Sequence, residues 1–112
     1  MTATPRRGEV WLAEVDRTRP VIVPTRDPMG RHLNAVLVAP ITSTAREVST
    51  EVPVGPADDI RVESVANLDN TQLLARTRLL RRVGRANPDT MSRLCDALAI
   101  AVDCTPLCVG IA

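Results

Sequence analysis

The sequence of 112 residues predicts a mainly β fold, a small curved barrel with one α-helix at its C-terminal end. Short apolar segments rich in β-branched residues follow one another through residues 8–74, separated by turn residues. One segment near the C-terminus instead repeats its apolar residues every three or four positions, which predicts a helix. Several short strands followed by one helix fit a small barrel with a helical cap.

The first part of the barrel is expected to consist of three strands, over residues 8–15, 19–25 and 34–42. The first has apolar residues at successive positions, so both of its faces should be partly covered. The third contains the unbroken apolar run 35–39, which predicts burial on both sides. Turn residues at 26–31 separate the second strand from the third.

Three further short strands are expected over residues 48–54, 63–68 and 72–74. Apolar and polar residues alternate regularly in the first of them, and its Pro53 lacks the N–H that a central strand needs. That segment is therefore predicted at an edge of the sheet. Residues 55–59 contain Gly and Pro and are predicted to form a surface turn.

The helix is predicted to begin after Asn87, a good N-cap residue, with Pro88 at the first helical position and Asp89 at the positive end of the helix dipole. Apolar residues then recur at steps of three and four, so one face is expected to pack on the sheet. That predicted face consists of Met91, Leu94, Cys95, Leu98 and Val102.

Length and composition favour a single domain over residues 1–112, because 45% of the residues are hydrophobic and supply enough material for a core. The sequence has no apolar run of about 18 residues, the length that a membrane helix needs. Residues 1–7 also lack the apolar segment of a signal peptide. We therefore expect a cytoplasmic protein without a membrane partner.

No residue pattern suggests a metal site or a cofactor. The cysteines, Cys95, Cys104 and Cys108, are odd in number and lack Cys-x-x-Cys spacing, so structural or incidental thiols are expected and neither disulfides nor zinc. His32 is the only histidine and lies in a predicted polar loop, where exposure is expected more than catalysis. We therefore expect that the protein uses no metal and no cofactor.

The net charge is only +1, but the charges are unevenly distributed along the chain. All 14 basic residues are arginines. Five of them stand in a segment of ten residues without an acid: Arg76, Arg78, Arg81, Arg82 and Arg85. Such a segment fits either a basic face for an anionic partner or an ordinary solvated surface, and both interpretations stay open.

Two apolar segments, 18–23 and 38–44, carry polar groups at one end, and a short barrel could bring Arg19 and Thr42 together at one rim. The guanidinium of arginine forms bidentate hydrogen bonds to phosphate oxygens. A threonine hydroxyl can donate to an oxygen whose charge grows in a transition state. The pair therefore suggests phosphoryl chemistry without metal.

Simpler interpretations of these residues stay open. Arg19 also fits a surface strand residue paired with Asp16. The hydroxyl residues 42–44 also fit ordinary strand and turn formers, because Ser and Thr often bond their own backbone. Trp11 is the only aromatic residue and is expected in the core rather than stacked on a base.

The order of several short motifs is similar to that of the MazF/PemK toxins of bacterial type II toxin–antitoxin modules, over a core of about residues 6–102. The motifs are Arg7-Gly8-Glu9-Val10-Trp11, Arg19-Pro20-Val21-Ile22-Val23, Ala39-Pro40-Ile41-Thr42-Ser43-Thr44, Thr50-Glu51-Val52-Pro53-Val54, Asn67-Leu68-Asp69-Asn70, Arg78-Leu79, Val83-Gly84-Arg85 and Asp96-Ala97-Leu98.

The resemblance implies an SH3-like barrel of the MazF/PemK/CcdB type, assembled as a homodimer. It also implies an endoribonuclease that cuts single-stranded RNA at short sequences and is held inactive by a cognate antitoxin, whose inhibitory segment is disordered or amphipathic. The RNA would be messenger RNA, with transfer RNA and ribosomal RNA as alternatives. Arg19 and Thr42 match the catalytic residues of the family, and the residues expected to contact RNA are Ser43, Thr44, Arg46, Asn70 and Gln72.

Metal-free cleavage of this kind uses the neighbouring 2′-hydroxyl as nucleophile and leaves a 2′,3′-cyclic phosphate and a 5′-hydroxyl. Many members of the family have a longer loop between the first two strands, whereas this chain has only Arg17 and Thr18 between Asp16 and Arg19. Asn70 and Gln72 replace the Gln and Arg that follow the late aspartate in other members. The base-reading groups are therefore expected to differ. A CcdB-like toxin that poisons a topoisomerase and a non-catalytic RNA-binding barrel stay open as alternatives.

Overall fold

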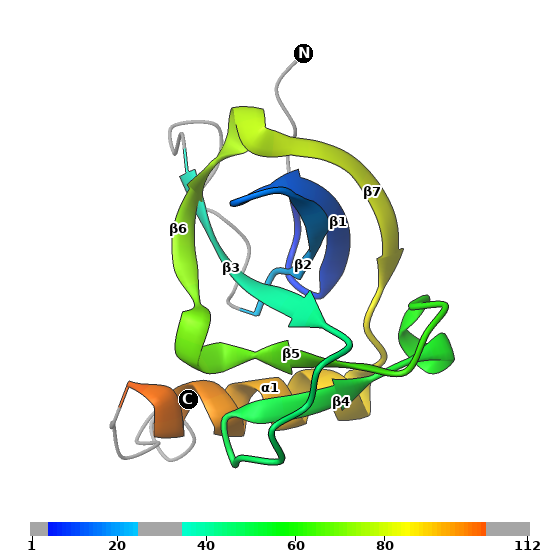
Figure 1. Cartoon of the computed structure of the whole chain (residues 1–112), viewed down its shortest axis with the longest axis vertical. Helices are drawn as coiled ribbons and strands as arrows, with labels where there is room; N and C mark the ends of the chain where they lie inside the picture. The colour runs from blue at the N-terminus through cyan, green and yellow to red at the C-terminus, as the bar shows by residue number, and fades with distance from the viewer. Residues whose placement is uncertain (1–4, 25–34, 103–112) are drawn as a thin grey trace.

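The computed structural model describes residues 5–24 and 35–102, which form a curved β-sheet with one helix against it (Figure 1). The strands are β1 (Glu9–Glu14), β2 (Thr18–Ile22), β3 (Ala35–Thr42), β4 (Glu51–Val54), β5 (Ser64–Asn67), β6 (Gln72–Ala75) and β7 (Leu79–Arg85). The helix α1 spans Pro88–Ala101, and three short 3-10 helices are found among the described residues: η2 (Pro56–Asp58), η3 (Leu68–Asn70) and η4 (Arg76–Arg78). The mainly β class with a C-terminal helix is thus confirmed.

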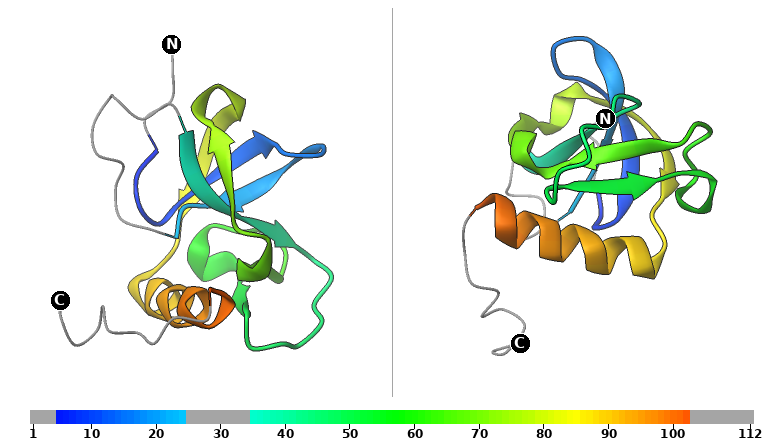
Figure 2. Two further views of the ribbon diagram at one scale, coloured as in Figure 1. Left: turned by 90° about the vertical axis from the view of Figure 1, so that its left-hand side faces the viewer. Right: turned by 60° about the horizontal axis from the view of Figure 1, so that its bottom comes forward.

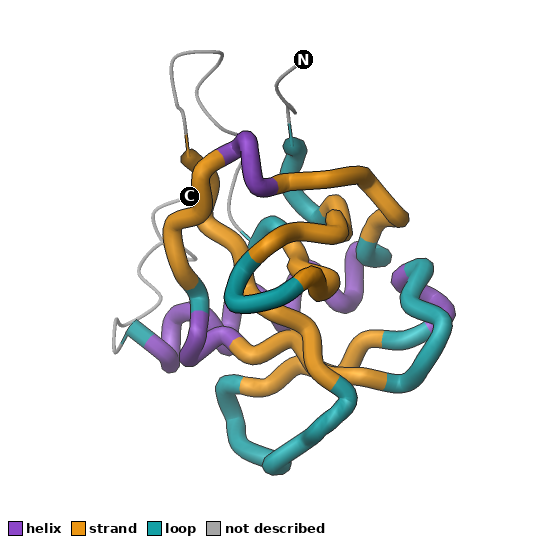
Figure 3. The backbone as a smooth tube through the Cα atoms, turned by 45° about the horizontal axis from the view of Figure 1, so that its top comes forward, coloured by secondary structure: helices purple, strands orange, loops and turns teal. Residues whose placement is uncertain are grey.

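One antiparallel sheet contains all seven strands, in the order β4-β5-β3-β2-β1-β7, with β6 paired to β3 beside this path. The strands curl around the middle of the molecule, but β4 and β7 are the two ends of the path, so the sheet is not closed (Figures 1 and 3). β4 carries Pro53 and lies at an edge, as the sequence predicts. β3 is central because it pairs with β2, β5 and β6 in turn.

The core has two parts, one on each side of this curled sheet. The first part lies between the sheet and α1 and contains Val10, Ile22, Leu68 and Leu94, each at most 1% exposed. The second part includes Ala13 and Val38, with the half-buried Trp11 packed against it. Burying an aliphatic side chain of this size stabilises a fold by about 1.5–3 kcal/mol. β1 contributes to both parts, so the expectations that both of its faces are covered and that Trp11 belongs to the core are confirmed.

The helix begins where the sequence predicts, since the Asn87 side chain accepts a hydrogen bond of 2.9 Å from the Thr90 N–H. α1 runs along β4 and η3 beneath the sheet (Figure 2). Its buried side chains are those of Thr90, Leu94 and Ala97.

The predicted helix face is wrong at two of its positions. Cys95 is exposed, because the buried stripe follows Leu94 and Ala97 and the next residue after Leu94 turns away by about 100°. Val102 is the C-cap residue and is 56% exposed. Cys95 is therefore not a buried structural thiol; its sulfur accepts a hydrogen bond of 3.3 Å from the Arg7 guanidinium.

Three other expectations need correction. Leu37 is 39% exposed, so the run 35–39 is not buried on both sides; β6 covers one edge of β3 and leaves this face open. The predicted surface turn at 55–59 contains η2, and its Asp58 is only 3% exposed because its carboxylate accepts hydrogen bonds from the Gly55 and Asn87 N–H groups. The basic segment forms η4, which contains Arg76 and Arg78, and strand β7, which contains its other three arginines; the sequence does not predict this strand.

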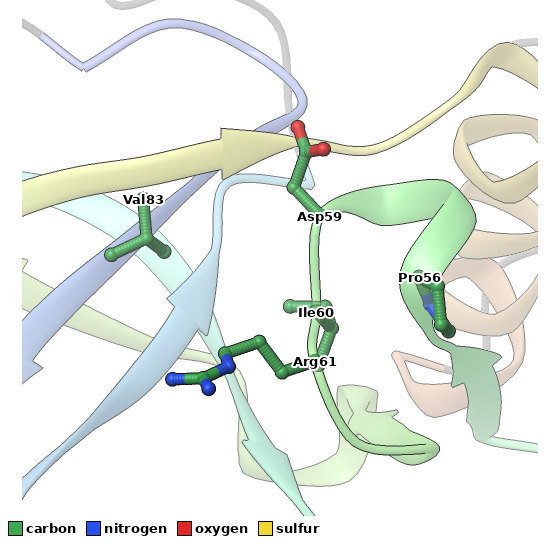
Figure 4. A pocket seen from close by; sticks show the side chains of 5 residues that line it. All are labelled: Pro56, Asp59, Ile60, Arg61 and Val83. Atoms are coloured by element: carbon green, nitrogen blue, oxygen red, sulfur yellow. The ribbon is translucent and has the colours of Figure 1, made fainter.

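Gly84 in β7 leaves room for the Asp59 side chain, which reaches toward this strand (Figure 4). A Cβ at residue 84 would lie 2.2 Å from the Cβ of Asp59. Asp59 is itself fixed there, because its carboxylate accepts a hydrogen bond of 3.1 Å from the Arg85 N–H and its backbone is left-handed, with φ 62°. The close approach of η2 to β7 thus requires glycine.

We expect Gly84→Ala to lower the free energy of unfolding by about 1–3 kcal/mol, the usual cost of overpacking. Gly55→Ala is a suitable control, because its Cβ would meet only the end of the flexible Glu63 side chain, at 2.6 Å. Urea denaturation of both variants measures the difference. Equal stabilities of Gly84→Ala and the wild type would show that Asp59 moves away without cost.

Candidate functional site

Arg19 lies near the start of β2, directly after the short turn that joins β1 to β2, and pairs in register with Ala13. Its Nη2 donates a hydrogen bond of 3.0 Å to Asp16 Oδ2, and the Arg17 N–H donates to the other oxygen of the same carboxylate at 2.9 Å. The simpler interpretation of Arg19 as paired with Asp16 is thus confirmed as a contact. The buried Nε–H of Arg19 has no hydrogen-bond acceptor among the described residues, so the guanidinium keeps unused donor capacity.

A surface depression of about 610 Å³ lies beside Arg19. Its walls come from the β1–β2 turn, β2, β3, η3 and the start of β6, and it is lined by Val15, Asp16, Arg19, Pro40, Asp69, Asn70, Thr71 and Gln72. The structure therefore brings together three of the predicted site residues, Arg19, Asn70 and Gln72, from segments about 50 residues apart in the chain.

Local hydrogen bonds fix the wall that carries Asn70. The Asn67 side chain accepts from the Asp69 N–H at 3.0 Å and begins η3, while the Thr71 hydroxyl donates to the Leu68 carbonyl at 2.8 Å. Gln72 then enters β6 and pairs with Val38.

Thr42 is the last residue of β3 and is half-buried. β2 and β3 pair through Val21 with Pro40, and the same register continued two residues beyond that pair leads to Arg19 and Thr42. Thr42 Oγ1 accepts a hydrogen bond of 3.2 Å from the Thr44 N–H, so its own O–H proton is directed elsewhere and can be donated to a ligand. Thr42 follows Pro40, which lines the depression, by two residues and is not itself one of the lining residues.

The other predicted RNA-contacting residues, Ser43, Thr44 and Arg46, are exposed on the loop 43–50 between β3 and β4. This loop projects from the sheet (Figure 2, left, and Figure 3). The structure thus places these three residues on a loop that follows Thr42 directly, and not on the walls of the depression.

The loop 43–50 folds over the carboxylate of Glu51, whose side chain is 3% exposed. Burial by itself raises the pKa of this carboxyl. The backbone N–H groups of residues 46–48 and the nearby Arg46 side chain stabilise the charged form more strongly and hold the pKa below its ordinary value of 4.5. Glu51 is therefore an ionised, buried group at neutral pH.

The structure places two carboxylates, Asp16 and Asp69, in the same depression as Arg19. Asp69 Oδ2 accepts a short hydrogen bond of 2.6 Å from the Thr50 hydroxyl. The three-residue spacing across a tight turn is a sequence signal for the Asp16 contact. The approach of Asp69 depends on how β3 pairs with β5 and β6, for which the sequence has no comparable signal.

The basic strand β7 lies apart from this depression, because it pairs with β1 on the far side from β2. Glu9, whose side chain is 7% exposed, forms ion pairs with Arg82 at 3.3 Å and Arg85 at 3.7 Å. The other oxygen of Glu9 accepts hydrogen bonds from the Arg6 N–H and the Trp11 indole. Arg82 and Arg85 therefore balance the charge of the buried Glu9 carboxylate, while their side chains stay 56% exposed.

A second depression, of about 550 Å³, lies between η2 and β7 and is lined by Pro56, Asp59, Ile60, Arg61 and Val83 (Figure 4). Within residues 5–24 and 35–102 no group of three His, Cys, Asp or Glu side chains is placed to hold a metal ion. His32, Cys104, Cys108 and the predicted turn at 26–31 lie outside the described residues. No helix in the described part of the chain is long and apolar enough to cross a membrane.

Comparison with known proteins matches residues 6–102 to the family described as PemK-like, MazF-like toxin of type II toxin-antitoxin system. A similar curated protein is the probable endoribonuclease MazF5 of Mycobacterium tuberculosis, which is 43% identical over 109 residues, covering 94% of this chain and 99% of the relative. The endoribonuclease MazF3 of the same species is 37% identical over 94 residues, covering 84% and 91%.

Solved structures agree in fold. The M. tuberculosis toxin MazF-mt6 superimposes with a TM-score of 0.81 at 36% identity, covering 87% of this chain and 98% of the other. A mycobacterial endoribonuclease in complex with its cognate antitoxin gives a TM-score of 0.80 at 29% identity, covering 88% and 95%.

Proposed function

The chain belongs to the PemK-like, MazF-like toxins of type II toxin–antitoxin systems and is an endoribonuclease of that family, and from this premise we propose how it cuts RNA. It cleaves single-stranded RNA at short sequences, without metal, and leaves a 2′,3′-cyclic phosphate and a 5′-hydroxyl. Messenger RNA is the proposed substrate, with transfer and ribosomal RNA as alternatives. A cytoplasmic location follows from that substrate.

The observation that carries this proposal is the depression of about 610 Å³ that Arg19, Asn70 and Gln72 line, together with a β2–β3 register that, continued beyond Val21 and Pro40, leads to Arg19 and Thr42. Arg19 and Thr42 would supply two donors of different kinds there, a permanently charged guanidinium and a hydroxyl. Together they suit a phosphate whose negative charge grows in the transition state.

In the proposed reaction the 2′-oxygen forms a bond to phosphorus as the bond from phosphorus to the 5′-oxygen breaks. The proton of the 2′-hydroxyl passes to solvent water as that bond forms, and the departing 5′-oxygen takes a proton from water. Arg19 and Thr42 hold the non-bridging oxygens and stabilise their added charge. Arg19 also stabilises the leaving oxygen, because a guanidinium stays protonated and therefore acts as a donor and not as a base.

In the absence of RNA, the Asp16 carboxylate is hydrogen-bonded to the Arg19 guanidinium. A phosphate of the RNA must displace this carboxylate. The Asp16 side chain is 68% exposed, and such surface ion pairs contribute only about 0–1 kcal/mol. Charge-assisted hydrogen bonds from arginine to phosphate contribute about 1.5–3 kcal/mol each. Opening the contact between Arg19 and Asp16 therefore costs little, and a phosphate can accept hydrogen bonds from two guanidinium nitrogens where Asp16 accepts from one.

Asn70 and Gln72 line the depression, and we propose that their amide groups read the base next to the cleaved phosphate. Ser43, Thr44 and Arg46 on the adjoining loop would hold the RNA backbone. Because Trp11 is in the core, base stacking on an aromatic ring is not available at this site, and hydrogen bonding and shape must supply the selectivity.

A homodimer and a cognate antitoxin complete the proposal. The cross-strand pair Leu37 and Leu73 exposes apolar surface on β3 and β6, which a second copy can cover. The antitoxin, which the mycobacterial complex exemplifies, would inhibit through a disordered or amphipathic segment that folds on binding.

We expect Arg19→Lys to lower the single-turnover cleavage rate of a short RNA by roughly 100-fold or more, because lysine keeps the charge but not the planar fork. Thr42→Val, which keeps the shape without the hydroxyl, should also reduce the rate. Arg81→Lys and Thr18→Val, both on exposed strand positions, are matched controls. Circular dichroism checks that all four variants fold, and rates near the wild type in Arg19→Lys and Thr42→Val would remove both residues from the site.

Cleavage is expected to continue in excess EDTA and to leave 5′-hydroxyl ends. This follows from a reaction in which Arg19 and Thr42 stabilise the phosphate. End-mapping of total RNA treated with the purified protein measures both properties. A loss of activity with chelator that magnesium restores would contradict the metal-free mechanism, and binding without cleavage would indicate an RNA-binding barrel.

Light scattering at micromolar concentration should give about twice the chain mass of 12.1 kDa. A monomer that cleaves RNA at the full rate would rule out the proposed assembly.

A further inference from the structure

Glu51, the first residue of β4, has a carboxylate that is enclosed by an otherwise exposed loop. Its side chain is 3% exposed, whereas every residue from 43 to 49 is exposed. The loop therefore has little apolar burial of its own to hold its shape. Its conformation must depend on polar contacts, and Glu51 makes several of them.

The backbone of the loop points its donors at this carboxylate. The Arg46 N–H donates to Glu51 Oε1 at 2.8 Å, and the N–H groups of Glu47 and Val48 also stabilise the charged form. The Glu51 N–H in turn donates to the Val48 carbonyl at 3.0 Å. Glu47 has φ 56°, the left-handed conformation that lets successive N–H groups converge on one anion.

Arg46 joins the same contact through its side chain. Its Nε lies 3.5 Å from Glu51 Oε2, while the Arg46 side chain as a whole stays 61% exposed. Because this ion pair uses the inner nitrogen, it does not occupy the two terminal nitrogens of the guanidinium. Glu51 thus orients Arg46 without using the part of the side chain that suits a phosphate.

Both ends of the loop are attached to the proposed site. At one end the Thr44 N–H donates to Thr42 Oγ1 at 3.2 Å. At the other end the Thr50 hydroxyl donates to Asp69 at 2.6 Å, and the Leu68 N–H donates to the Thr50 carbonyl at 3.0 Å. The loop therefore spans from the end of β3 to η3, and Glu51 lies beneath its middle.

We propose that Glu51 is a positioning residue, whose buried carboxylate fixes the loop 43–50 so that Ser43, Thr44 and Arg46 hold the RNA backbone beside Arg19 and Thr42. This role rests on the proposed function for the identity of the ligand, and on the contacts above for the loop. Glu51 does not touch the RNA. Its negative charge is balanced by the loop donors and Arg46, so it does not repel the phosphates that the loop binds.

Glu51→Gln tests this role, because it keeps the shape but puts an amide donor among the backbone N–H groups. We expect the amide resonances of residues 46–48 to shift or broaden in nitrogen–proton correlation spectra. With a short RNA substrate, KM should rise by about 10-fold, the effect of losing about one charge-assisted hydrogen bond. The kcat should change by no more than about twofold, because Arg19 and Thr42 stay in place.

Asp58→Asn is the matched control. Asp58 is also a buried carboxylate, 3% exposed, that accepts hydrogen bonds from two backbone N–H groups, but these belong to Gly55 and Asn87, away from the loop. The Asp58→Asn substitution should lower the melting temperature of the protein without changing KM. If Glu51→Gln fails to fold, the same measurements are made on Glu51→Asp. This variant keeps the negative charge, but its side chain is one methylene shorter and moves the carboxylate away from the loop donors.

Loop resonances that stay in place in the Glu51 variants, or a KM that is unchanged or rises equally in Asp58→Asn, would overturn the positioning role. If the wild-type protein cleaves no RNA, the proposed function fails by itself. The spectra and the affinity for a short RNA oligonucleotide, compared between Glu51→Gln and Asp58→Asn, then still decide whether Glu51 positions the loop.

Discussion

The pairing of β3 with three different strands is the constraint on which the rest of the structure depends. Residues 35–38 pair with β6, Ala39 and Pro40 pair with β2, and Ile41 and Thr42 pair with β5. Through these pairings β3 joins β2, β5 and β6 in one sheet that curls around the second part of the core (Figure 1). It also brings the start of β2, η3 and the start of β6 to one place, where Arg19, Asn70 and Gln72 share a depression. Site and core therefore come from the same backbone geometry.

Carboxylates near an RNA site need an explanation, since they repel phosphate. Asp16, Asp69 and Glu51 all lie close to the proposed RNA path, and each has a donor: the Arg19 guanidinium, the Thr50 hydroxyl and the loop N–H groups respectively. The contacts of Asp69 and Glu51 shape the backbone that carries the proposed RNA-binding residues, and the contact of Asp16 is weak and exposed. The chain has a net charge of only +1, so local geometry contributes more to recognition here than long-range attraction does.

Much of the fold could be predicted because the relevant signals are local. Alternation and β-branched runs located most strands, and Asn87 with Pro88 located the start of the helix. The sequence does not predict strand β7, because its arginines interrupt the alternation of apolar and polar residues. The strand is stabilised by its pairing with β1, which contains two register shifts, and by the ion pairs to Glu9. The helix phase was wrong at Cys95 because tertiary packing, and not spacing alone, decides which stripe faces the sheet. The order of the motifs identifies Arg19 and Thr42 as candidate catalytic residues. The approach of Asp69 and the fold of the loop over Glu51 depend instead on pairing between strands that are far apart in the sequence.

The central claim is that the phosphate to be cleaved binds between Arg19 and Thr42. A crystal structure of the protein with a short RNA that carries a 2′-O-methyl group at the mapped cleavage position tests it most directly, because the nucleophile is blocked and the complex persists. The proposal predicts the phosphate in contact with the Arg19 guanidinium and the Thr42 hydroxyl, with Asp16 released from Arg19. A phosphate bound on the β7 arginines, with the contact between Arg19 and Asp16 intact, would contradict it.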